Sequence, residues 1–93
     1  METFTEAEIL SLEDVLNDVE IQKSLILYND DFNTFDYVID SLIEVCDHQA
    51  EQAEQCAFFV HYKGKCEIKN GTFNKLKPMR TELNRRGLDA KIE

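Results

Sequence analysis

The stretch LILYNDDFNTFDYVI, from Leu25 to Ile39, decides how the rest of the chain folds. It begins with an apolar run that is typical of a strand and breaks at the polar triplet Asn29-Asp30-Asp31. Apolar residues then return at helical spacing, at Phe35, Val38, Ile39, Leu42, Ile43 and Cys46. The pattern predicts a strand, a polar elbow and a helix. Because both flanks belong to the core, a site built at the elbow would be rigid.

The same criteria divide the remaining chain into short elements. A first strand is predicted over residues 21–28, and Thr34 is the expected N-cap of a helix that runs to about Asp47. A second helix is predicted over residues 49–61 and ends before Gly64. Its apolar residues are Ala50, Ala53, Cys56, Ala57, Phe59 and Val60.

A short strand is predicted over residues 65–69, followed by a tight turn at Asn70-Gly71. A third helix is expected over residues 73–86, and its internal Pro78 implies either a later start or a kink. The alternation of Leu88, Ala90 and Ile92 predicts a last strand. The expected order is strand, helix, helix, strand, helix, strand, which is an α+β domain.

Composition and charge limit the classes of function. The 93 residues allow one domain, and a net charge of -9 argues against nucleic acid and anionic membranes as partners. Residues 1–20 hold seven acids and no Lys or Arg, whereas residues 21–93 hold 12 acids and 10 bases. We therefore expect an acidic flexible extension over residues 1–20 and a folded domain over residues 21–93. Because no signal peptide or membrane span is recognisable, a cytoplasmic protein is expected.

Two segments carry a family resemblance. LYNDDFNTFDYVI (residues 27–39) and VHYKGK (Val60 to Lys65) resemble the corresponding segments of ClpS, an adaptor that carries proteins with destabilising N-terminal residues to a Clp unfoldase and its protease. The resemblance implies a three-stranded antiparallel sheet packed against three helices. It also implies a binding module and not an enzyme, without a metal or cofactor.

A free protein N-terminus needs particular partners. Its α-amino group is largely protonated near neutral pH and offers up to three hydrogen-bond donors with a positive charge. Its burial therefore requires acceptors on several sides, at least one of them anionic. Asn29, Asp30 and His61 supply an amide oxygen, a carboxylate and an imidazole nitrogen, and they match the amine-binding residues of the family. An acetylated terminus should not bind there.

The side chain of the same N-terminal residue needs an apolar pocket. By resemblance this pocket is formed by Phe35, Val38, Ala57, Val60 and Leu88, with Asn33 at the rim. The usual Thr-Pro-Met after the elbow is replaced by Asn33-Thr34-Phe35, and Ala57 stands where many members carry Met. We expect a reshaped pocket that binds N-terminal Phe, Leu, Tyr or Trp, ranks them differently and admits β-branched residues.

The resemblance also implies a partner protein, the N-terminal domain of a ClpA- or ClpC-type AAA+ unfoldase. Tyr62, Lys63 and Lys75 are the candidate contacts with it, with surface solvation as the alternative role of the lysines. A monomer is the default expectation.

Two other functions remain open on the residues alone. One is a small interaction domain on the same scaffold, similar to the C-terminal domain of the ribosomal stalk protein, that binds a helix or loop instead of a free terminus. The other is a thiol or metal sensor that uses Cys46, Cys56, Cys66, His48 and His61. Their spacings are wide and contain no Cys-x-x-Cys pair, so structural cysteines are the simpler interpretation.

Overall fold

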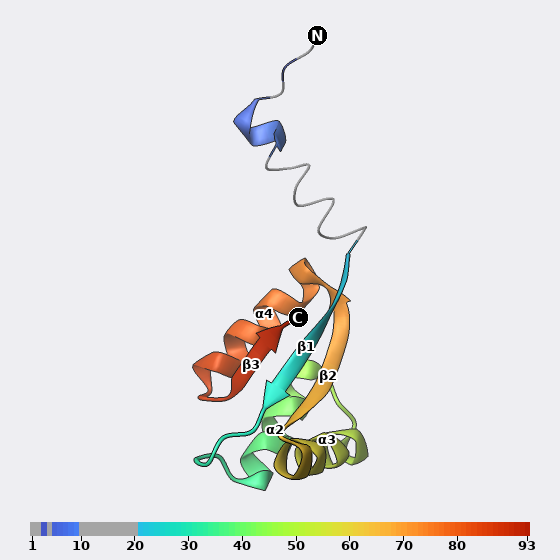
Figure 1. Cartoon of the computed structure of the whole chain (residues 1–93), viewed down its shortest axis with the longest axis vertical. Coiled ribbons are helices and arrows are strands. Elements are labelled where there is room, and N and C mark those ends of the chain that lie inside the picture. Colours follow the sequence, from blue (N-terminus) through green and yellow to red (C-terminus); the bar gives the residue numbers. More distant parts are fainter. Residues whose placement is uncertain (1–2, 4, 10–20) are drawn as a thin grey trace.

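Figure 1 shows the computed structural model, which describes residue 3, residues 5–9 and residues 21–93. Most of the predicted extension over residues 1–20 lies outside the described residues. The elements of the domain are β1 (Gln22–Tyr28), α2 (Phe35–Cys46), α3 (Ala50–Lys63), β2 (Lys65–Thr72), α4 (Phe73–Arg85) and β3 (Asp89–Ile92).

The strands form one antiparallel sheet in the order β2-β1-β3. Strand β1 lies in the centre, so that the elbow that follows it leaves from the middle of the sheet (Figure 1). The three helices pack against this sheet, and the predicted α+β class and element order are confirmed. Within the described residues, no helix is long and apolar enough to cross a membrane.

The helix ends that flank the elbow are fixed by local chemistry. Thr34 caps α2 as predicted, because its hydroxyl accepts a hydrogen bond from the Tyr37 N–H at 3.1 Å. Helix α3 ends at Gly64, whose φ of 90° lies in the left-handed region that glycine adopts without strain. The Gly64 carbonyl accepts a hydrogen bond from the Asn29 N–H at 2.9 Å, which joins the start of the elbow to the end of α3.

The core lies between the sheet and the helices. Leu25 and Leu27 of β1 are at most 1% exposed and pack with buried residues of all three helices. Each fully buried leucine contributes about 2 kcal/mol of transfer free energy. The helical members of the core are Leu42, Cys46, Ala53, Cys56, Val60, Leu76 and Leu83.

The predicted tight turn at Asn70-Gly71 is wrong. Strand β2 continues through both residues, which pair with Ser24 and Lys23 of β1. The chain turns only at Thr72, where the hydroxyl accepts a hydrogen bond from the Lys75 N–H and caps α4. Helix α4 therefore starts at Phe73 with Pro78 inside it, which contradicts a later start. Pairing with β1 outweighed the local turn signal of Asn-Gly.

Two members of the predicted apolar face of α3 are also wrong. Ala50 is exposed, and Phe59 is 54% exposed. The buried face consists of Ala53, Cys56, Ala57 and Val60. Phe59 follows Ala57 by two residues, which turns it about 200° round the helix and away from the core.

Candidate functional site

The elbow holds an oriented carboxylate. One oxygen of Asp30, Oδ1, accepts hydrogen bonds from the backbone N–H groups of Phe32 at 2.9 Å and Asn33 at 2.8 Å. The other oxygen, Oδ2, accepts one from the side-chain amide of Asn33 at 2.8 Å. Such bonds are typical of Asp in a turn, and here they fix the direction of both oxygens.

These bonds also keep the carboxyl group charged. Partial burial raises the pKa of Asp30, but the hydrogen bonds from Asn33 and Phe32 stabilise the ionised form more strongly and hold the pKa below its ordinary value. Asp30 is therefore an anion at neutral pH. An anion with spare lone pairs at the edge of the core is suited to bind a cation that donates hydrogen bonds.

Helix α3 supplies the facing wall. Ala57, Val60 and His61 follow one another at helical spacing, so that they lie on one face at the C-terminal end of the helix. Ala57 and Val60 are buried, whereas His61 is exposed. The His61 ring lies 5.2 Å from the ring of Phe35, centroid to centroid, at the start of α2.

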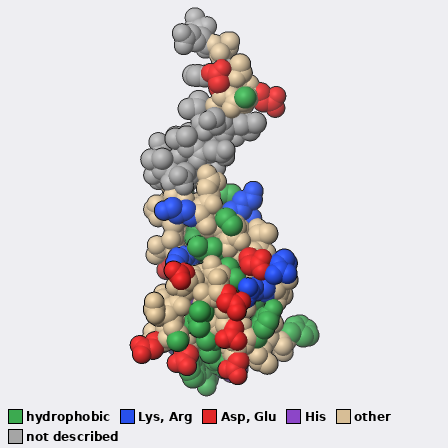
Figure 2. Space-filling view, turned by 180° about the vertical axis from the view of Figure 1, so that it is seen from behind, with side chains coloured by type: hydrophobic (Ala, Val, Ile, Leu, Met, Phe, Trp, Pro, Cys, Tyr) green, Lys and Arg blue, Asp and Glu red, His purple; other side chains and the backbone are tan. Residues whose placement is uncertain are grey.

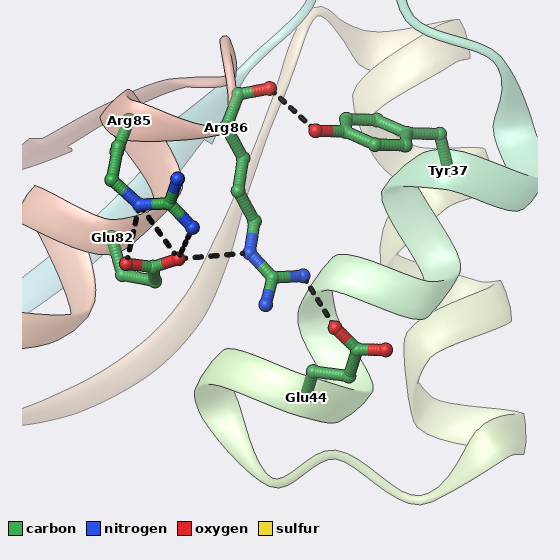
Figure 3. A network of polar contacts seen from close by, with 5 residues as sticks. All are labelled: Tyr37, Glu44, Glu82, Arg85 and Arg86. Carbon is green, nitrogen blue, oxygen red and sulfur yellow. Dashed lines mark hydrogen bonds and ion pairs between the residues drawn. The ribbon is translucent and has the colours of Figure 1, made fainter.

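The segment between α4 and β3 completes the enclosure. The Asn33 amide donates a second hydrogen bond, to the Gly87 carbonyl at 3.0 Å, and the Tyr37 hydroxyl donates one to the Arg86 carbonyl at 2.7 Å. Figure 3 shows how the Arg86 side chain connects α2 with α4, through Glu44 at 2.6 Å and Glu82 at 3.2 Å. These contacts hold Leu88, which is 3% exposed, beside the start of α2.

Together these elements enclose a cavity of about 50 Å³. It is lined by all nine residues that the sequence analysis assigned to the amine site and the pocket: Asn29, Asp30, Asn33, Phe35, Val38, Ala57, Val60, His61 and Leu88. Two further residues, Leu27 and Tyr28, also line it and were not predicted. Their position directly before Asn29 in β1 was the available signal.

The cavity combines two kinds of surface. Polar groups of Asn29, Asp30 and His61 stand beside apolar walls from Val38, Ala57, Val60 and Leu88. Most ligand sites have a few placed polar groups on a mainly apolar lining. The chemistry of this site fits a small cationic amine that is attached to an apolar side chain.

The candidate unfoldase contacts are not brought together. Tyr62 is 71% exposed and Lys63 is exposed, and both lie beside the cavity at the end of α3. Lys75 is also exposed but lies in the first turn of α4. Strand β2 separates the two ends: Lys65 pairs with Tyr28, and Thr72 pairs with Gln22 at the opposite end of β1 (Figure 1).

The cysteines and histidines were the candidates for a thiol or metal sensor. Among the described residues, no group of three or more His, Cys, Asp or Glu side chains is placed to hold a metal ion. Burial raises the pKa of the Cys46 thiol to about 11, and burial and the hydrogen bond that Cys66 donates to Cys56 raise that of Cys66 to about 12. Thiols with raised pKa values are poor nucleophiles. His48 is buried, and its Nε2 lies 2.6 Å from the Ile68 carbonyl, which is a structural contact.

Comparison with known proteins identifies the family of this chain. A family model described as ATP-dependent Clp protease adaptor protein ClpS matches residues 21–91. The chain belongs to the ClpS family. The match begins before β1 and ends at residue 91, within β3, so that it includes all helices and strands of the domain except the last residue of β3.

A curated ClpS adapter from Salmonella gallinarum is 40% identical over 55 residues, which cover 59% of this chain and 51% of the Salmonella protein. The chain thus spans about half the length of this ClpS relative. A solved structure, Agrobacterium tumefaciens ClpS2 bound to L-phenylalaninamide, superposes with a TM-score of 0.67 at 18% identity. It covers 77% of this chain and 94% of the Agrobacterium chain, which shows that the ClpS fold is shared.

Proposed function

We propose that this chain binds proteins through a free N-terminus that begins with a bulky hydrophobic residue, and delivers them to a ClpA- or ClpC-type unfoldase for degradation by ClpP. The observation that carries the proposal is the Asp30 carboxylate, oriented by Asn33 at the edge of an apolar cavity. The ligand of the Agrobacterium structure, L-phenylalaninamide, combines the two groups that this cavity suits, an α-amine and an apolar side chain.

In the proposed complex, the α-amine lies among Asn29, Asp30 and His61. A carboxylate oxygen of Asp30 and the amide oxygen of Asn29 each accept one N–H, and the His61 ring nitrogen accepts a third, directly or through water. The positive charge is then matched by the full negative charge of Asp30, which is partly buried, so that the ion pair is stronger than one in bulk solvent. Acetylation removes this charge and two of the donors.

The first side chain enters between α2 and α3. Val38, Ala57, Val60 and Leu88 provide its apolar surroundings, Phe35 closes the mouth, and Asn33 lies at the rim. Transfer of a Phe or Leu side chain from water to such walls contributes about 2 kcal/mol. The pocket therefore supplies affinity, whereas the polar groups supply the requirement for a free terminus.

Delivery requires a second surface. Tyr62 and Lys63, beside the cavity, and Lys75, at the far end of β2, are the proposed contacts with the N-terminal domain of the unfoldase. We place the acidic extension of residues 1–20 in the transfer of the substrate, and the protein in the cytoplasm, where its three unpaired cysteines stay reduced. The chain acts in this account as a binding module without catalysis.

A degradation assay tests the function. A ClpA- or ClpC-type unfoldase and ClpP are mixed with a fluorescent reporter that begins with Phe, with and without the full chain. We expect degradation to accelerate when the chain is added, and an excess of a free Phe peptide to suppress it. An acetylated peptide is the matched control and should not compete. No acceleration, or equal competition by the acetylated peptide, would refute the proposal.

A further inference from the structure

Two exposed aromatic rings on α3, of which Tyr62 is also a proposed contact with the unfoldase, lie outside the pocket for the first residue. Phe58 is 53% exposed and Tyr62 is 71% exposed. They are four residues apart, and their rings stack with centroids 5.9 Å apart and planes 5° from parallel. Neither ring lines the cavity.

The pair continues the wall of the cavity. The Phe58 ring lies 5.3 Å from the Phe35 ring, and the Tyr62 ring lies 4.9 Å from the His61 ring. Phe35 and His61 both line the cavity. An unbroken aromatic surface therefore runs from the interior of the site to its outside along α3.

The aromatic surface of Phe58 and Tyr62 lies at an end of the molecule where other hydrophobic side chains are also exposed. Figure 2 shows hydrophobic side chains exposed at the end of the molecule that α2 and α3 form, with acidic side chains beside them. Exposed apolar area next to a binding cavity commonly contributes to the binding of the same ligand. The stack fixes the two rings against each other, so that little side-chain entropy would be lost when a ligand covers them.

We propose that Phe58 and Tyr62 form a second subsite, which binds a large apolar side chain at the second position of the substrate. This inference rests on the proposed function, because it requires the first residue to occupy the cavity. Consecutive Cα atoms of a peptide are about 3.8 Å apart. A residue that follows one seated beside Phe35 and His61 is therefore within side-chain reach of the next rings outward, which are those of Phe58 and Tyr62.

The position of the rings around the mouth of the cavity also favours the second residue of the substrate as the group that they bind. Asn29 and Asp30 occupy the elbow side of the mouth, and Asn33 with its bond to the Gly87 carbonyl closes the side toward β3. The chain of a bound peptide can leave over α3, where the exposed rings lie. Among proteins with a bulky first residue, those with a second large apolar residue are thus the preferred substrates.

The test measures the preference at the second position. Labelled peptides that begin Phe-Gly or Phe-Leu, each with a free and an acetylated terminus, are titrated with the full chain and its variants. We expect the unchanged chain to bind the Phe-Leu peptide about fivefold more tightly than the Phe-Gly peptide, since a leucine is partly buried on the rings. In Tyr62→Ala, and in Phe58→Ala, the two affinities should converge to within about twofold.

Phe59→Ala is the matched control. Phe59 is 54% exposed on the same helix, but within residues 21–93 no aromatic ring contacts it. This variant should keep the full preference for Phe-Leu. Phe58→Ala removes a ring that packs on Phe35, and Tyr62→Ala removes one that packs on His61. The readout is therefore the ratio of the Phe-Leu and Phe-Gly affinities, because a change in the pocket wall would alter both affinities together.

The outcomes separate the two proposals. The subsite is refuted and the proposed function stands if free termini bind but the Phe-Leu and Phe-Gly peptides bind equally well. The same holds if the preference for Phe-Leu persists in Tyr62→Ala. If Tyr62→Ala slows delivery by the unfoldase while the preference persists, the ring faces the unfoldase and the subsite is likewise refuted. If neither free peptide binds, the proposed function itself has failed, and the subsite with it.

Discussion

Asn33 holds the Asp30 carboxylate with two hydrogen bonds, one from its backbone N–H and one from its side-chain amide, each 2.8 Å long. The same amide donates to the Gly87 carbonyl at 3.0 Å. One side chain therefore connects the proposed anion of the amine site to the segment that carries Leu88. The polar and apolar halves of the site are therefore positioned by a shared contact.

The first prediction concerns the anion. Asp30→Ala should weaken binding of a free Phe peptide by about 100-fold, because the ammonium group then lacks a partner in a partly dry site. Asp31→Ala is the control, since Asp31 is exposed in the same elbow and does not line the cavity. Isothermal titration should give an affinity for the control within about twofold of the unchanged chain. Equal losses in both variants would show that only the net charge of the elbow matters.

The second prediction concerns orientation of the anion. Asn33→Ala removes the side-chain hydrogen bonds to Asp30 and Gly87 but leaves the carboxylate in place. We expect affinity to fall by about tenfold, less than for the loss of the carboxylate itself. The pKa of Asp30 should also rise toward its ordinary value, which carboxyl NMR titration can measure. An unchanged pKa with unchanged affinity would contradict the positioning role of Asn33.

The third prediction compares two neighbouring arginines. Arg86 joins α2 to α4 through Glu44 and Glu82, whereas Arg85 forms an ion pair only with Glu82 among the residues that the structure describes (Figure 3). The Arg86 side chain is 23% exposed and that of Arg85 is 70% exposed. Arg86→Ala should therefore lower the thermal midpoint and weaken peptide binding more than Arg85→Ala, because the segment before Leu88 loses its tie to α2. The reverse order in calorimetry would contradict this.

The fourth prediction is a pH profile. The pKa of Asp30 is below its ordinary value in the folded chain, so its stabilising contribution is present above that ordinary value and is lost as the pH falls through the folded pKa. The carboxylate is thus charged throughout the neutral range. On the alkaline side, the peptide amine loses its proton above about pH 8, and affinity should fall about tenfold by about pH 9. An affinity that stays constant between about pH 8 and about pH 9 would mean that the charge of the amine is not recognised.

The fifth prediction concerns selectivity. The Phe35 ring of α2 packs against the His61 ring at the mouth of the pocket. Ala57 of α3 has a small side chain and leaves room within the pocket. N-terminal Phe and Leu should bind more tightly than Trp, whose larger ring would displace Phe35, and Ile or Val should bind measurably. Competition titrations with these peptides check the order. Equal affinity for Leu and Trp together with rejection of Ile and Val would contradict a reshaped pocket.

Much of the fold was predictable because the local signals agree with the tertiary contacts. The strand, elbow and capped helix between Gln22 and Cys46 follow from apolar spacing and from Thr34. The errors arose where pairing or helix phase overrode a local signal. Asn70-Gly71 looks like a turn but extends β2 by pairing with β1, and Phe59 looks like core but faces solvent.

The lining of the site was predictable through resemblance more than through pattern. Sequence motifs pointed to Asn29, Asp30 and His61, but no spacing rule indicates that Leu88 comes to lie beside them. Its position depends on the hydrogen bonds of Asn33 and Tyr37 to backbone carbonyls more than 40 residues away. The stacked pair of Phe58 and Tyr62 could not be predicted from the sequence either, because helical spacing alone does not tell whether two rings are buried or exposed.

The most direct test is fluorescence anisotropy of a short labelled peptide that begins with Phe, titrated with the full chain. We expect micromolar or tighter binding of the free terminus, no measurable binding after acetylation, and binding about 100-fold weaker in Asp30→Ala. Equal binding of the free and acetylated peptides would contradict this account and would favour an interaction domain that does not recognise free termini.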